Sequence, residues 1–266
     1  MLPIQEIFAL FLLGGAVGTI GALVGIGGGL ILVPVLIFLG LDPHVATGTS
    51  LAVVLFTGLS SALAYFRQKR VDWRTGLILE LTTAPGGFLG AFLTTLASSK
   101  QMKIFFSLLM MFVAYKMWRG GLELGSFASK FKIRRRLVDS DGKIIEYDVD
   151  IAPAIALSFL AGLASGFFGI GGGVLKVPIL MAAGAPVHVA VATSSFMIVI
   201  TASSALLERA SLGQIRYYYL IGLIPGTIIG AQIGARIAKR TRSRILRRGF
   251  ALVLCAASIY MIARSL

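Results

Sequence analysis

The chain has 266 residues, of which 57% are hydrophobic and only 14% are charged. Ordinary soluble domains carry about 25% charged residues, so this composition and a mean hydropathy of +0.89 exclude a water-soluble globule and indicate a polytopic membrane protein. The 25 Lys and Arg residues outnumber the 11 Asp and Glu residues, which gives a net charge of +14. Nearly all basic residues lie in short segments between long apolar runs, so the excess reflects membrane topology and not nucleic-acid binding.

Cysteine and histidine are too sparse for a metal or redox centre. The single cysteine, Cys255, lies inside the last apolar run, which excludes a disulfide or a cysteine metal site within one chain. The two histidines, His44 and His188, have no carboxylate cluster near them in the sequence. We therefore expect no metal and no cofactor, and we expect both histidines to pack at helix starts.

The first part of the chain contains four apolar blocks. Spanning about 30 Å of hydrocarbon takes about 20 apolar residues in a helix. The charge-free stretch 7–41 is too long for one straight span and barely long enough for two. Further apolar blocks follow at 43–66, 75–99 and 101–118, so we assign residues 1–118 to a first transmembrane repeat.

Residues 119–150 have the composition of a soluble protein, with seven basic and six of the 11 acidic residues. We predict that they form a linker outside the membrane, on its cytoplasmic side. Within this linker, the pair Asp141-Gly142 is flanked by Val138 and by Ile144-Ile145. This pattern is typical of a two-residue turn and predicts a small β-hairpin.

The rest of the chain repeats the first part. Apolar blocks at 151–185, 187–207, 217–235 and 249–263 make residues 151–266 a second transmembrane repeat. Shared features this numerous indicate a fused duplication. The equivalent pairs are G-I-G-G-G at 25–29 and 169–173, Thr49-Ser50 and Thr193-Ser194 at an offset of 144, and Pro85 and Pro225 at an offset of 140.

Loop charges suggest how the two repeats are oriented, because Lys and Arg accumulate on the cytoplasmic side. In the first repeat, the segment 67–74 has four basic residues and the segment 100–103 has two. The bias reverses in the second repeat, where 209–216 has two and 239–248 has six. This swap favours inverted repeats with an odd number of crossings each. The alternative is eight crossings in parallel repeats.

Each repeat contains four glycines within five residues. A glycine costs about 1 kcal/mol relative to alanine inside a helix, so we predict an all-α protein whose helices break near the membrane centre. Matching breaks mark the binding site of many transporters, because half-helix N-termini attract anions. The alternative is that the glycines only permit close helix packing. The predicted substrate-binding glycines are Gly25, Gly27, Gly28, Gly29, Gly169, Gly171, Gly172 and Gly173.

Paired hydroxyl residues lie inside the apolar blocks at equivalent places of the two repeats. Thr49, Ser50, Thr193 and Ser194 provide donors that suit an oxyanion, and we include them among the candidate substrate ligands. The alternative is hydrogen bonding between helices or to the backbone, which is common for Ser and Thr in membrane helices.

Two ionisable residues lie within apolar blocks. Lys176, three residues after the second glycine stretch, is a candidate for neutralising a substrate anion, because a charge at membrane depth is costly. The alternative is that it snorkels to an interface. Glu80 is the only acid well inside an apolar block of the first repeat and is a candidate for proton coupling. Its alternatives are snorkelling and pairing with a basic residue.

The two G-I-G-G-G-x4-P stretches, each followed by a Thr-Ser pair, occur together with QKRVDW at 68–73 and with two Pro-Gly-x3-Gly-Ala blocks. This set of motifs resembles the TauE/SafE sulfite exporter family of membrane transporters. The resemblance covers both repeats and leaves out the linker. It implies transport, usually export, of small anions, chiefly sulfur oxyanions or sulfonates.

We therefore expect a multi-pass exporter of sulfite or an organosulfonate in the cell membrane, with a small anion and the lipid bilayer as its partners. A carrier of small carboxylates and an anion channel on the same broken helices are the alternatives. A membrane enzyme would need clustered ionisable groups, such as paired carboxylates, and we expect no enzymatic activity. The oligomeric state is left open.

Overall fold

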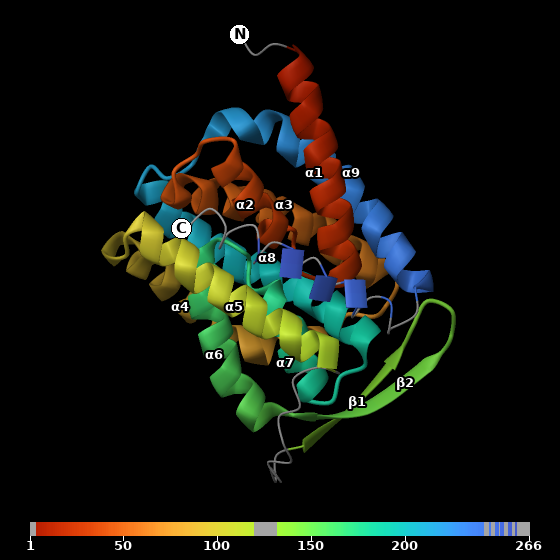
Figure 1. Cartoon of the computed structure of the whole chain (residues 1–266). Helices are drawn as coiled ribbons and strands as arrows, with labels where there is room; N and C mark the ends of the chain where they lie inside the picture. The colour runs from red at the N-terminus through yellow and green to blue at the C-terminus, as the bar shows by residue number, and fades with distance from the viewer. Residues whose placement is uncertain are drawn as a thin grey trace.

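A computed structural model of the protein describes residues 4–119 and 132–241, and residues 245, 248, 249, 251, 252, 255, 256 and 259. This part of the chain is mostly helical (Figure 1), which confirms the predicted fold class. It contains six helices that are long and apolar enough to cross a bilayer, so the protein is a multi-pass membrane protein. They are α1 (Ile4–Val24), α3 (Pro43–Arg67), α4 (Trp73–Leu93), α6 (Ile151–Phe168), α8 (Val187–Ser211) and α9 (Tyr217–Arg240).

Shorter elements complete the described part. The helices α2 (Gly29–Phe38) and α7 (Gly173–Ala182) have 10 residues each, and a short 3-10 turn, η1 (Thr94–Leu96), precedes α5 (Ser99–Arg119). The series α1, α2, α3, α4 recurs in order as α6, α7, α8, α9. Of the predicted last block, the described residues are helical and the others lie outside the described part.

The long first block of each repeat breaks at its glycines. Three glycines of the first stretch have φ between 75° and 84°, and three of the second have φ between 68° and 77°. This left-handed backbone is open to glycine without a steric penalty, so α1 and α6 end there and α2 and α7 begin. The predicted helix breaks are present in the structure. The six glycines are Gly25, Gly27, Gly28, Gly169, Gly171 and Gly172.

Residues 120–131 of the predicted linker lie outside the described part, and residues 132–150 form an antiparallel hairpin of β1 (Lys132–Val138) and β2 (Ile144–Asp150). The predicted two-residue turn is wrong, because a loop of residues 139–143 joins the strands. The Asp139 carboxylate accepts hydrogen bonds from the backbone N–H groups of Asp141 at 2.8 Å and Lys143 at 3.0 Å. These bonds stabilise the longer loop in the way typical of Asx turns.

Two equivalent helix pairs pack closely around a central pair. A Cβ added to Gly226 of α9 would lie 2.9 Å from the backbone nitrogen of Gly15 in α1. In the equivalent pair, a Cβ at Gly162 of α6 would lie 3.0 Å from the nitrogen of Gly87 in α4. Small residues allow such approach between membrane helices. The pairs flank α3 and α8, which have the largest buried shares of the six spans.

The hairpin docks on the loop between α3 and α4. The buried carboxylate of Asp72 accepts hydrogen bonds from Arg135 Nε at 2.9 Å and from Tyr147 Oη at 2.8 Å. Burial alone would raise the pKa of Asp72, but the hydrogen bonds from Arg135, Thr75 and Tyr147 outweigh it and hold that pKa below its usual value. Arg70 and Asp139 add an ion pair at 3.0 Å.

We expect Asp72→Asn to loosen the hairpin at neutral pH by about 1–3 kcal/mol, because the hydrogen bonds to the carboxylate are charge-assisted. The pKa of Asp72 in the folded protein is lower than its unfolded value of about 3.9, so its carboxylate stabilises hairpin docking fully above that unfolded value. This contribution is lost as the pH falls through the folded pKa. Hydrogen exchange of the β1 and β2 amides measures the effect. Glu146→Gln, which removes the exposed ion pairs with Arg134 and Arg136, is the matched control. Equal exchange in the two variants would contradict the assignment.

Candidate functional site

The two glycine breaks meet between α3 and α8. A Cβ added to Gly29 would lie 2.8 Å from the carbonyl oxygen of Gly169, and a Cβ added to Gly173 would lie 2.5 Å from the Cα of Ile26. Segments 144 residues apart are therefore in direct backbone contact. All eight predicted glycines are buried in this glycine junction, which comprises residues 25–29 and 169–173.

Two serines tie the junction together across the repeats. Ser50 Oγ donates to the carbonyl oxygen of Gly169 at 3.0 Å, and Ser194 Oγ donates to that of Gly25 at 2.8 Å. Each serine thus satisfies a carbonyl group that the break in the other repeat sets free. The matched bonds show that the predicted Ser positions lie at the junction.

The two threonines hold the starts of other helices. Thr49 Oγ1 accepts from the backbone N–H of Arg216 at 2.9 Å, just before α9. Thr193 Oγ1 accepts from the backbone N–H of Asp72 at 2.9 Å, just before α4. Both threonines therefore make the backbone contacts that the sequence allowed as the alternative to ligand binding.

Both short helices direct their N-terminal ends at the junction. Gly29 begins α2 and Gly173 begins α7. Among the described residues, the structure gives no acceptor for the N–H groups of these two glycines. Unpaired N–H groups at a helix start carry a partial positive charge. The junction therefore has the donors that an anion requires.

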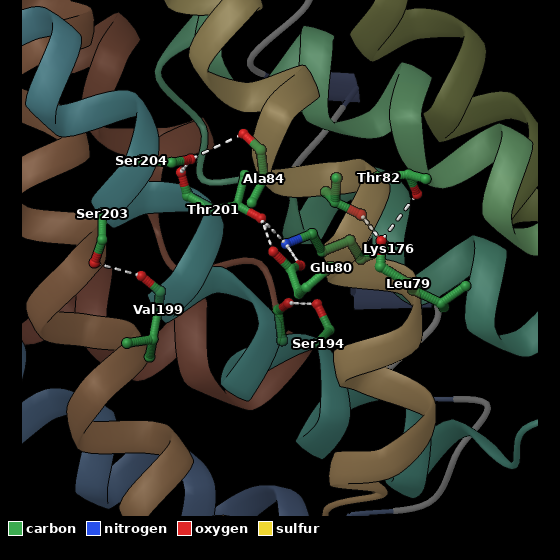
Figure 2. Close-up of polar contacts among 12 residues, drawn as sticks. Leu79, Glu80, Thr82, Ala84, Lys176, Ser194, Val199, Thr201, Ser203 and Ser204 are labelled. Carbon is green, nitrogen blue, oxygen red and sulfur yellow. Dashed lines mark hydrogen bonds and ion pairs between the residues drawn. The ribbon is translucent and has the colours of Figure 1, made fainter.

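A buried ion pair adjoins the second break (Figure 2). Lys176 Nζ from α7 lies 2.6 Å from Glu80 Oε1 of α4 and 2.5 Å from Thr201 Oγ1 of α8. Thr201 Oγ1 lies 2.6 Å from the other carboxylate oxygen of Glu80. The exposed fractions of Lys176, Glu80 and Thr201 are 1%, 4% and 0%. The structure therefore joins the two predicted ionisable residues into one group, the Lys-Glu-Thr triad.

This arrangement excludes snorkelling for both residues. Lys176 does not snorkel, and Glu80 pairs with a basic residue of the other repeat. A single charge taken out of water costs several kcal/mol, whereas a hydrogen-bonded pair of opposite charges recovers much of that cost. The triad is therefore neutral as a whole, and its ammonium group already has a counter-ion.

A polar group without a partner lies beside the triad. A Cβ at Gly172 would lie 3.1 Å from Lys176 Cε and 3.2 Å from Ser165 Oγ, so both side chains border the break. Ser165 Oγ is buried and has no hydrogen-bond partner among the described residues. Buried polar groups without partners are rare. A ligand oxygen at this place would satisfy it.

Neither residue of the ion pair has a charged equivalent in the other repeat. The position equivalent to Lys176 is Leu32, which is fully buried, and the position equivalent to Ser165 is Gly21. The residue equivalent to Glu80, at the offset of 140, is Leu220. The buried ion pair thus has an apolar counterpart, Leu32 and Leu220, in the internal repeat.

The sequence pattern predicted that Arg209 lies in a loop, and this prediction is wrong. It lies in α8, is fully buried, and donates from Nη2 to the carbonyl oxygens of Gly166 at 3.1 Å and Phe167 at 3.2 Å. The equivalent Tyr65 donates to the carbonyl oxygen of Ala22 at 2.8 Å. Both side chains therefore cap the helix that precedes a break. The sequence signal for a capping role of Arg209 was its equivalence to Tyr65 at the offset of 144.

Thr201 and Ser165 were also missed by sequence reasoning. Ser and Thr are common in membrane helices and usually bond to the backbone, so their presence alone indicates no site. The signal available for Thr201 was its match to Thr57 in the first repeat.

In the described part of the chain, no group of three or more His, Cys, Asp or Glu could hold a metal ion.

Apolar spanning helices, two of which end at glycine breaks that meet beside one buried ion pair at the second break, define a multi-pass protein of the membrane-transporter class. The chain belongs to the sulfite exporter TauE/SafE family, which matches residues 10–261. The predicted family is confirmed, and the protein is a membrane transporter.

Similar proteins carry transporter names. The chain is 34% identical over 254 residues to the probable membrane transporter protein YunE of Bacillus subtilis, covering 92% of this chain and 93% of the relative. It is 30% identical over 269 residues to a probable membrane transporter protein of Xylella fastidiosa, covering 99% and 98%. A stretch of 59 residues, 22% of this chain and 13% of the relative, is 47% identical to sulfite exporter TauE/SafE family protein 5 of Arabidopsis thaliana. No solved structure matches the chain.

Proposed function

We propose that the protein exports a small anion, sulfite or an organosulfonate, which binds at the glycine junction beside the Lys-Glu-Thr triad. The observation that supports this most is the buried ammonium group of Lys176, placed next to the start of α7. An oxyanion there would meet a positive charge, the N–H groups of a helix start and the unpaired hydroxyl of Ser165. Small carboxylates are the alternative substrates, and an anion channel is the alternative mechanism.

We further infer that the repeats at 1–118 and 151–266 are inverted. The backbone carbonyl of Gln68, just after α3, accepts from Ser140 of the hairpin. The backbone N–H of Asp150 donates to Ala183, just before α8. The equivalent helices α3 and α8 therefore end and begin, respectively, at the hairpin end of the bundle. The basic residues of 67–74, and Lys239 and Arg240, belong to that end, which favours a cytoplasmic hairpin.

Proton coupling through Glu80 follows from charge balance in the triad. An anion that approaches the neutral pair brings one uncompensated negative charge into a buried site, at a cost of several kcal/mol. If Glu80 takes up a proton, Lys176 pairs with the anion and the site stays neutral. Anion binding should therefore take up one proton. A monoanion that crosses the membrane together with this proton carries no net charge. Its export is then driven by its own concentration gradient, which is directed outward.

Transport by purified protein in liposomes tests the substrate and the mechanism. We expect saturable counterflow of sulfite or a small alkylsulfonate, and a rise in melting temperature with the same anion, because a ligand of the folded state stabilises it by mass action. Single-channel currents would show that the protein is an anion channel and not a carrier. If acetate stabilises the protein and supports counterflow while sulfur anions have no effect, the substrates are small carboxylates.

A further inference from the structure

A basic cavity opens at the hairpin end of the bundle, away from the glycine junction. It has a volume of about 540 Å³ and lies between the C-terminal ends of α3 and α9, with Ser140 of the hairpin at its wall. Its charged lining residues are all basic, and they come from both repeats. They are Arg67 of α3, and Arg236, Lys239 and Arg240 of α9.

Three of these four cations have no counter-ion in the described part of the chain. Lys239 Nζ forms an ion pair with Asp141 of the hairpin at 2.7 Å. Arg67, Arg236 and Arg240 form no ion pair among the described residues, and all three are exposed. Guanidinium groups bind phosphate oxygens in a bidentate manner. Three of them around one cavity therefore fit a phosphate group.

Apolar side chains continue from the cavity along the same helix faces. On α3, Leu59 and Leu63 precede Arg67 at steps of four residues and are 46% and 51% exposed. On α9, Ile229 and Ile233 are 52% and 45% exposed and precede Ile237 of the cavity lining at the same steps. Residues four apart share one helix face. The ligand should therefore have an anionic head and apolar chains.

We propose that this cavity binds an anionic phospholipid of the leaflet at the hairpin end. Its phosphate contacts Arg67, Arg236 and Arg240, and its acyl chains lie along the leucines of α3 and the isoleucines of α9. Basic pockets between membrane helices bind such headgroups. Because α3 and α9 belong to different repeats, the lipid joins the two repeats and the hairpin.

Thermal unfolding of the purified full chain in detergent tests the proposal. Short-chain phosphatidylglycerol should raise the melting temperature, and phosphatidylcholine and inorganic phosphate at the same concentration should not. In Arg67→Gln/Arg236→Gln, the affinity for phosphatidylglycerol should fall about 25-fold, since each charge contributes about fivefold. Arg74→Gln/Lys143→Gln removes two exposed charges from the same end outside the cavity and should keep the affinity.

Each other outcome overturns the proposal. Stabilisation by inorganic phosphate equal to that by phosphatidylglycerol would identify a site for a soluble anion. Equal loss of affinity in both double variants would show that only net charge matters. If Arg67→Gln/Arg236→Gln folds poorly, mass spectrometry of the intact wild-type protein counts bound phosphatidylglycerol, and its absence contradicts the site.

Discussion

Lys176→Gln/Glu80→Gln is expected to reduce anion flux in liposomes at least tenfold while the protein stays folded. The double variant removes the ammonium group that we propose to bind the anion, and a hydrogen bond to a charged group contributes about 1.5–3 kcal/mol. It leaves no buried charge without a partner. Lys176→Ala alone leaves Glu80 buried and unpaired, which costs about 3–5 kcal/mol of stability. The double variant thus separates transport from folding.

The single variant Glu80→Gln tests whether anion binding is coupled to proton uptake. Glu80→Gln has no carboxylate to take up a proton, so anion binding should no longer take one up, and flux should lose its dependence on pH. Because this variant leaves the buried Lys176 without its counter-ion, it should also lose stability, and its melting temperature is measured beside its flux. The matched control is Arg134→Gln/Glu146→Gln, which removes the two exposed ion pairs of Glu146 in the hairpin and should transport at the wild-type rate. Wild-type flux in Lys176→Gln/Glu80→Gln would remove Lys176 from the binding site.

Gly173→Ala is expected to destabilise the protein by about 1–3 kcal/mol, the usual cost of overpacking, and to abolish transport. The added methyl group would lie 2.5 Å from the Cα of Ile26 and closer still to the carbonyl oxygen of Gly25. Both are backbone atoms of the other break, so the contact is relieved only by moving the two breaks apart. The melting temperature and the flux in liposomes measure the two effects.

Gly15→Ala is the control for this variant. Gly15 is also a glycine within a membrane helix, but its added methyl group meets only the carbonyl oxygen of Gly226, at an ordinary 3.8 Å. Alanine is the better helix former, so stability should be kept or increased and transport should continue. If both variants transport alike, contact between the breaks is not required for function.

Local sequence patterns were sufficient to predict most of the fold. Apolar runs of sufficient length gave the spanning helices, because the bilayer requires about 20 apolar residues per helix. Clustered glycines indicated the breaks, because glycine opposes a continuous helix and is favourable at positive φ. The match of 25–29 to 169–173 indicated the duplication. Each of these signals lies within a short segment.

The partners within the site could not be predicted in this way. Lys176 and Glu80 are 96 residues apart, and the sequence presented each as an isolated candidate. Arg209 lies so near a helix end that its burial depends on how α8 packs against α6. In helices that are apolar on most sides, periodicity does not indicate which face is turned inward.

The amino-acid sequence by itself determined a duplicated membrane protein with two broken helices and a polar linker, because hydropathy, glycine content and repetition act locally along the chain. Only the tertiary structure decided that the two breaks touch and that Lys176 meets Glu80 and Thr201 beside one of them. The physical reason is that these contacts depend on the rotation and depth of helices from both repeats. Packing between helices fixes those two quantities, and composition leaves them open.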